Sequence, residues 1–114
     1  MSLSVAIVIR ENPLRTHRAA EAVRIALGLS TGDNPLTVIL LGQSPMLLAE
    51  DPEDLIDADI LDKHLPVLKE LKIPFVVPQG AKAFFGLDPE FATREATLEG
   101  IRELIREADR VLAF

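Results

Sequence analysis

The chain has 114 residues, of which 48% are hydrophobic, and its formal net charge is −6. This composition predicts a single globular domain over residues 1–114 and excludes a disordered tail. The acidic balance argues against nucleic acid and against an anionic membrane surface as partners, because both attract clustered lysine and arginine. No apolar run reaches the roughly 18 residues of a membrane span, and the default location is cytoplasmic. The absence of cysteine excludes disulfides, thiol nucleophiles and Cys-based metal sites from these residues.

The first third of the chain has the pattern of a buried strand followed by a helix. Residues 3–9 (LSVAIVI) form a nearly continuous apolar run, which is typical of a strand covered on both faces. They lack the basic lead-in and small-residue cleavage site of a signal peptide. Asn12 and Pro13 predict the N-cap and first position of a helix. This helix is expected to end at Gly28 or Gly32.

The middle of the chain predicts a second strand at residues 36–41 (LTVILL) and a short helix at residues 44–48. Residues 50–62 hold seven carboxylates in thirteen positions, which predicts a surface loop leading into another helix. Pro66 within that helix predicts either a late regular start or a kink. The apolar stripe of this helix consists of Leu61, Leu65, Leu68 and Leu71.

The last third predicts a short strand at residues 73–77, one helical turn at residues 81–85, a long helix from Thr93 and a terminal strand at residues 111–114. The long helix is expected to turn five apolar residues inward and to form i, i+3 ion pairs on its solvated face. The inward residues are Leu98, Ile101, Leu104, Ile105 and Ala108, and the solvated ones are Glu99, Arg102, Glu103 and Arg106. Alternating strands and helices favour a parallel sheet with right-handed crossovers. We therefore predict a three-layer α/β/α sandwich of flavodoxin-like type, with a mostly parallel sheet of about four or five strands. Its centre is expected to hold Val5, Ile7, Val38, Leu40 and Val76.

Ligands of open parallel sheets bind at the carboxyl ends of the strands. Three loops meet that description, at residues 10–16, 42–45 and 78–86. The first loop leads into a helix whose N-terminus favours an anion, but no glycine there lets a phosphate approach the backbone closely. Two interpretations stay open, a small-anion site or a capped helix with solvated basic residues. The predicted ligand-binding residues are Arg10, Asn12, Arg15, His17, Gln79 and Gly80.

The sequence offers no candidate for catalysis, for a metal or for a cofactor. His17 and His64 are too far apart for a metal-binding pair. No serine or threonine has a base near it in the sequence, so no hydrolase triad is visible. Phe84 and Phe85 are adjacent and cannot both face one core from a helical turn. Either one of them is exposed at an interface, or both lie beneath the loop.

Three segments resemble the DsrE/DsrF-like family of small α/β proteins, which includes sulfur-relay subunits. They are VAIVIRENP, HRAAEAVRIALGLSTGDNPLTVILLG and EADRVLAF. The resemblance implies a DsrEFH-like fold that assembles as homotrimers, hexamers or hetero-oligomers. It also implies a persulfide-carrying cysteine in the loop after the third strand. The matching position here falls at about Pro78 or Gln79, and neither side chain can carry sulfur.

Three hypotheses about function follow. The first is a non-catalytic DsrE-like subunit with a structural or regulatory role in intracellular sulfur relay. It would have no cofactor and would associate with itself or with other sulfur-relay subunits. The second is a small-anion or nucleotide-binding module that uses the loops at the carboxyl edge of the sheet. The third is an enzyme with thiol-free chemistry. The aromatic segment at residues 78–91 is expected to lie at or near a subunit contact.

Overall fold

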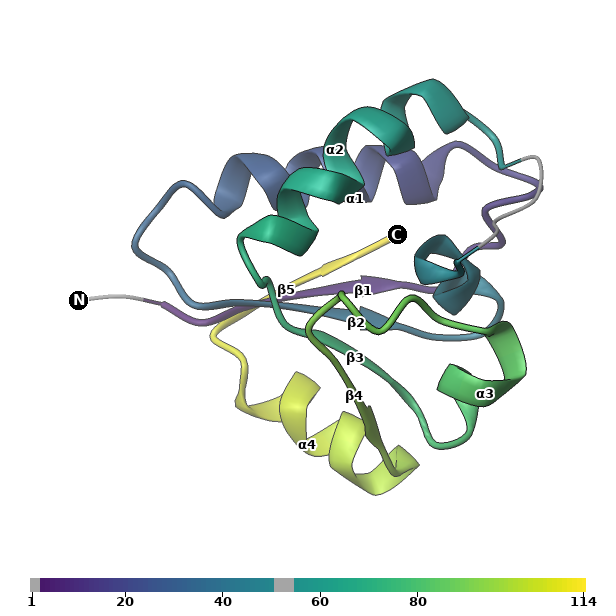
Figure 1. Cartoon of the computed structure of the whole chain (residues 1–114). Helices are drawn as coiled ribbons and strands as arrows, with labels where there is room; N and C mark the ends of the chain where they lie inside the picture. The colour runs from purple at the N-terminus through teal and green to yellow at the C-terminus, as the bar shows by residue number, and fades with distance from the viewer. Residues whose placement is uncertain (1–2, 51–54) are drawn as a thin grey trace.

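The computed structural model describes residues 3–50 and 55–114, so part of the acidic run, residues 51–54, lies outside the described residues. Strands and helices alternate along the chain (Figure 1). In chain order the elements are β1 (Val5–Ile9), α1 (Arg18–Leu29), β2 (Leu36–Leu40), the 3₁₀ helix η1 (Ser44–Leu48), α2 (Ala58–Glu70), β3 (Phe75–Pro78), α3 (Ala81–Phe85), β4 (Thr93–Ala96), α4 (Leu98–Glu107) and β5 (Arg110–Ala113).

The five strands form one sheet in the order β4-β3-β2-β1-β5, and every neighbouring pair is parallel. Helices α1 and α2 cover one face of this sheet and α4 covers the other, as Figure 1 shows. This arrangement confirms the predicted α/β/α sandwich. The order also places the reversal of strand order between β1 and β5, since β2, β3 and β4 all lie on the other side of β1.

The core has two layers because the apolar strands are covered on both faces. The larger cluster packs under α1 and α2, and the smaller one packs against Ile101 of α4. The predicted centre is confirmed, since all five of its residues are buried. They are Val5, Ile7, Val38, Leu40 and Val76. Among the described residues, no helix is long and apolar enough to cross a membrane.

The start of α1 differs from the sequence-based prediction. Asn12 does not cap the helix, which begins six residues later at Arg18. The side chain of Asn12 instead accepts a hydrogen bond from the N–H of Leu14, and its carbonyl accepts from Arg15 and Thr16. Asn12 therefore closes a local turn, which is the competing use of this residue type. The predicted helix N-terminus at Pro13 is wrong.

Strand β4 was not predicted, and the expected helix start at Thr93 is wrong. Residues Thr93–Ala96 (TREA) pair in parallel with β3, and α4 begins only at Leu98. The hydroxyl of Thr97 caps α4 by accepting the N–H of Gly100. A four-residue edge strand with charged side chains carries no apolar alternation, so pairing with β3 decides its conformation rather than local propensity.

Helix α2 runs through Pro66 from Ala58 to Glu70, so the predicted late start is wrong. An interior proline costs a helix roughly 3 kcal/mol. Burial of Leu61, Leu65 and Leu68 against the core offsets that cost, at about 1.5–3 kcal/mol for each side chain. Leu71 lies beyond the helix and is exposed, contrary to the predicted stripe.

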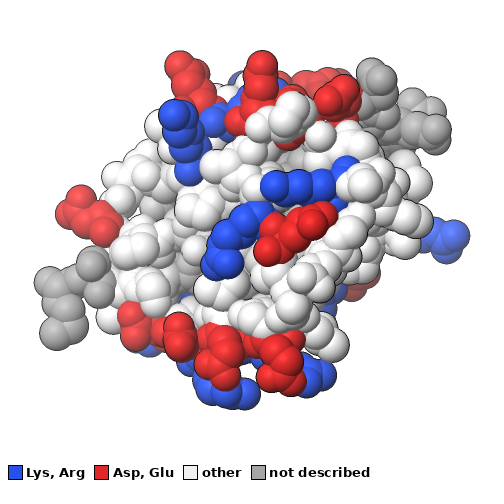
Figure 2. Space-filling view, turned by 60° about the horizontal axis from the view of Figure 1, so that its bottom comes forward, with Lys and Arg blue, Asp and Glu red and all other residues white. Residues whose placement is uncertain are grey.

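Helix α4 is amphipathic, with one correction to the predicted inward set. Ile101 is buried, whereas Leu98, which was expected to face inward, is 63% exposed. The predicted i, i+3 ion pairs are present between Glu99 and Arg102 and between Glu103 and Arg106. Figure 2 shows acidic side chains gathered along the lower part of the face that α4 covers, with basic ones beside them.

Candidate functional site

The carboxyl ends of β2 and β3 border an open groove of about 370 Å³. Gly42 and Gln43 line it from the loop after β2, and Gln79 and Gly80 line it from the loop after β3. Phe84 of α3 closes one side. This groove therefore contains two of the six predicted ligand-binding residues, Gln79 and Gly80.

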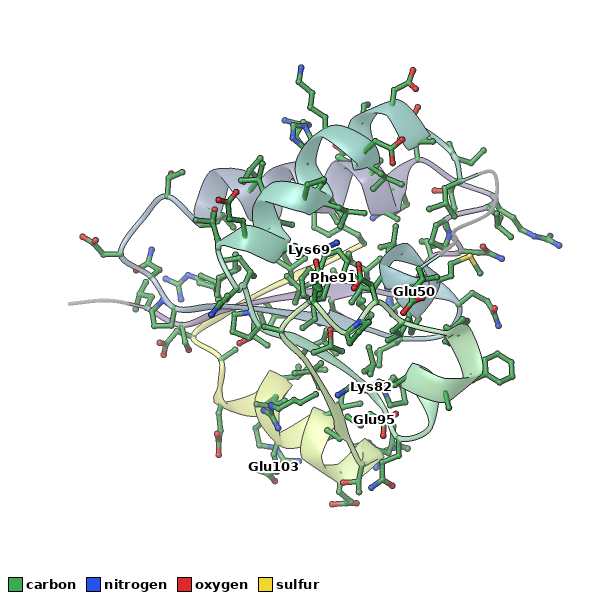
Figure 3. All side chains as sticks on the ribbon, viewed as in Figure 1. Glu50, Lys69, Lys82, Phe91, Glu95 and Glu103 are labelled. Atoms are coloured by element: carbon green, nitrogen blue, oxygen red, sulfur yellow. The ribbon has the colours of Figure 1, made fainter. Side chains whose placement is uncertain are left out.

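The turn that leads from β3 into α3 is bonded to a carboxylate of the same chain. Gly80 has a φ of 88°, a left-handed conformation that glycine adopts without strain. Oε2 of Glu95, on β4, accepts hydrogen bonds from the backbone N–H groups of Gly80 (3.0 Å) and Lys82 (3.1 Å). Because these N–H groups at the start of α3 would otherwise lack intrahelical partners, Glu95 satisfies them much as a bound anion would. Figure 3 shows Glu95 beside Lys82 at this position.

The sequence did not predict the role of Glu95. The residue lies 15 positions after Gly80, and only the parallel pairing of β4 with β3 brings it to this turn. Only the register between β3 and β4 indicates this contact. Glu95 pairs with Val77, one residue before the end of β3, and is therefore next to the turn that follows. A correct prediction of β4 would have been needed to find it.

The other four predicted residues lie between β1 and α1, and none of them lines the groove. Arg10 and Arg15 are exposed, and the backbone N–H of Arg10 donates to the carbonyl of Phe114 at 2.8 Å. The Asn12 side chain is occupied by its own turn. His17 lines a separate cavity of about 270 Å³ between α1 and α2. The structure therefore does not bring the two parts of the predicted site together.

The strand order explains this separation. Strand β2 lies between β1 and β3, and neighbouring strands are about 4.8 Å apart. The reversal of strand order, where ligands of open α/β sheets usually bind, lies between β1 and β5. There the guanidinium of Arg18 lies 5.9 Å from the centre of the Phe114 ring.

Ser44 fastens the carboxyl ends of β1 and β2 to each other, whereas the sequence suggested Ser44 and Pro45 only as the cap of the short helix. It is the one fully buried polar side chain in residues 3–50 and 55–114. Its hydroxyl lies 2.8 Å from the carbonyl of Ile9 and 2.7 Å from that of Leu41. The Ser-Pro pair at the start of η1 was the only sequence signal for this contact.

A cluster of charged side chains joins α2 to the segment between α3 and β4. Nζ of Lys69 lies 2.7 Å from Oδ2 of Asp88 and 3.9 Å from Oε2 of Glu90. The same ammonium group lies 4.7 Å from the centre of the Phe91 ring. Phe91 in turn packs edge-to-face against Phe75, with 5.7 Å between ring centres. The cluster thus ties the surface ion pair to the core, and Figure 3 shows Lys69 directly beside Phe91.

The ion pair shifts the pKa of both partners. The hydrogen bond from Lys69 lowers the pKa of the Asp88 carboxyl below its ordinary value of 3.8, and the N–H of Glu90 lowers it further. The hydrogen bond with Asp88 likewise raises the pKa of Lys69 above its ordinary value of 10.5. A carboxyl with a lowered pKa stabilises the folded state above its ordinary pKa, and that contribution is lost as pH falls through the lowered value. The contribution of Lys69 is present below 10.5 and is lost as pH rises through the raised value.

Replacing Asp88 by asparagine is expected to lower the free energy of unfolding by about 1 kcal/mol at neutral pH, since the pair is partly exposed and screened by solvent. Asparagine keeps an oxygen for the N–H of Glu90, so the change isolates the charge. The difference from the wild type should shrink below pH 3.8. Urea unfolding of both proteins at several pH values measures this difference in the free energy of unfolding. Glu90→Gln serves as the control, and an Asp88→Asn effect that did not depend on pH would contradict this account.

No group of three or more His, Cys, Asp or Glu side chains is placed to hold a metal ion within residues 3–50 and 55–114. No family model matches the chain, and no curated protein matches it. Among solved structures, the chain is similar to the ychN protein from E. coli. The TM-score is 0.76 and the sequence identity is 18%, over 100% of both chains. The chain therefore has a DsrE-like α/β fold, and at this identity the likeness concerns the fold alone.

Proposed function

We propose that this protein is a non-catalytic DsrE-like subunit, with a structural or regulatory role related to intracellular sulfur relay. It acts through surface contacts rather than through covalent chemistry. The observation that carries this proposal is the state of the loop after β3. Its N–H groups are bonded to the chain's own Glu95, and its side chains include no thiol.

Two features of this loop support the proposal over an anion-binding module. Glu95 places a negative charge where an incoming anion would need the free N–H groups of Gly80 and Lys82. A like charge at that distance repels an anion. Asn12, the other polar group expected to contribute from the β1 loop, is bonded within its own turn. A cytoplasmic location remains the prediction of the sequence.

The aromatic residues of α3 support a role in association. Phe84 is 78% exposed, whereas Phe85 is half-buried and packs on the core. The two rings meet edge-to-face with 4.9 Å between their centres. An exposed aromatic ring beside an open groove is typical of the residues that anchor a protein interface. We infer that Phe84 contacts a second copy of this chain, within a trimer or hexamer.

Replacing Phe84 by aspartate is therefore expected to dissociate the assembly. Light scattering at low micromolar concentration should give a multiple of 12.5 kDa for the wild type and 12.5 kDa for the variant. Phe84 suits this test better than Phe85, because changing a half-buried residue would also disturb folding.

Leu98→Asp is the matched control. It introduces the same charge at another exposed apolar residue, on α4, and is expected to leave the mass unchanged. A wild-type mass of 12.5 kDa would refute self-association. Equal dissociation by both variants would show that added charge, and not loss of the Phe84 contact, separates the subunits.

A further inference from the structure

A second cavity, of about 450 Å³, lies apart from the groove at the ends of β2 and β3. The end of η1, helix α3, the segment at residues 87–91 and the first residue of β4 surround it. Its volume falls within the range of small-molecule sites, which is about 300–1,000 Å³. None of the residues predicted from the sequence to bind a ligand lines it.

The walls of this cavity are held by backbone hydrogen bonds. The N–H of Glu50 donates to the carbonyl of Gly86 at 3.0 Å, and the N–H of Asp88 donates to Leu48 at 2.7 Å. Ala49 and Leu87 form an antiparallel bridge between the same two segments. The end of η1 and the segment after α3 therefore keep a fixed separation, so the cavity is a built feature of the fold.

Two opposite charges line the cavity without neutralising each other. The ammonium group of Lys82 and the carboxylate of Glu50 form no ion pair within 4.0 Å in the part of the chain that the structure describes. Asp88, the third charged residue of the lining, is already paired with Lys69. Figure 3 shows that Glu50 and Lys82 come from different elements, with Phe91 between α2 and this region.

The rest of the lining is mostly apolar, with one polar exception. Ala83, Leu87 and Phe91 contribute hydrocarbon surface. The hydroxyl oxygen of Thr93 is buried and has no hydrogen-bond partner among the described residues, which is uncommon for a buried polar atom. A ligand for this cavity needs an apolar part, one negative group for Lys82 and one positive group for Glu50.

We propose that this cavity binds a small zwitterion, an α-amino acid with an apolar side chain. Lys82 holds its carboxylate, Glu50 holds its ammonium group, and Leu87 and Phe91 contact its side chain. A simple anion is disfavoured by Glu50, and a simple cation is disfavoured by Lys82. The backbone N–H of Lys82 is bonded to Glu95, which fixes the start of α3, and Lys82 is one of the residues that line the cavity.

Titration of the ¹⁵N-labelled protein with L-leucine and with L-phenylalanine tests this proposal by NMR. At least one of them is expected to shift the amide signals of Lys82, Ala83 and Leu87 in a saturable way. Two analogues of leucine carry a single charge, 4-methylpentanoate and 3-methylbutylamine. Both should bind at least about tenfold more weakly, because each lacks one charge-assisted hydrogen bond.

Lys82→Gln and Glu50→Gln should each weaken binding of the amino acid by about tenfold or more. Lys63→Gln removes the same charge from an exposed residue of α2 and should not change the affinity. A preserved amide spectrum shows that each variant is folded. The proposal is overturned if neither amino acid binds, if a singly charged analogue binds equally well, or if both glutamine variants keep the wild-type affinity. None of these outcomes bears on the oligomeric mass that tests the proposed function.

Discussion

Replacing Phe75 by alanine is expected to lower the free energy of unfolding by about 3–5 kcal/mol, the largest loss for any single change considered for this chain. Phe75 is 1% exposed and lies on β3, between β2 and β4 in the sheet. Its ring packs edge-to-face against Phe91, whose other neighbour is the ammonium group of Lys69. Truncation therefore leaves a cavity in the core and also removes the support of Phe91.

Urea unfolding followed by circular dichroism measures this loss. Phe84→Ala is the matched control, since it removes the same ring from a residue that is 78% exposed. The control should change the free energy of unfolding of the separated subunit by no more than about 0.5 kcal/mol. A Phe75→Ala loss below about 1 kcal/mol would show that this ring is not the centre of the packing described here.

Replacing Glu95 by alanine is expected to cost about 1–2 kcal/mol, the usual range for the loss of a helix cap. The change leaves the N–H groups of Gly80 and Lys82 without their acceptor, so the start of α3 should fray. Hydrogen exchange of these two amides reports the effect at the site, and urea unfolding reports it for the whole chain.

Arg94→Ala is the control for this prediction. Arg94 is the neighbouring residue on β4, is also exposed, and makes no hydrogen bond to the turn among those found in the described residues. Faster exchange of Gly80 and Lys82 in the Glu95 variant alone supports the role assigned to this carboxylate. Equal exchange rates in the wild type and in both variants would show that Glu95 does not protect these two amides.

Much of the fold could be predicted because the strongest local signals agree with the tertiary structure. Strands β1 and β2 are nearly continuous apolar runs, and buried parallel strands require that composition. The pattern of α2 was found despite Pro66, because its buried leucines recur at helical spacing. The sequence left open whether one of Phe84 and Phe85 is exposed or both lie beneath the loop, and the structure shows Phe84 exposed and Phe85 half-buried.

The remaining features depend on contacts between distant segments. Strand β4 owes its conformation to pairing with β3, and its sequence, TREA, favours no strand by itself. Asn12 could cap a helix or close a turn, and the local sequence is compatible with both. The predicted ligand site combined loops after β1 and β3, but the sequence cannot show that β2 lies between these strands.

The loop after β3 is expected to carry no sulfur chemistry, and intact-mass measurement of the protein checks this expectation. The purified protein is incubated with a persulfide donor, freed of excess reagent and weighed by mass spectrometry. The mass of the chain should be unchanged, because no thiol is present to accept sulfur. A stable gain of about 32 Da, one sulfur atom, would contradict it, since such an adduct requires a nucleophile in this chain that the account does not contain.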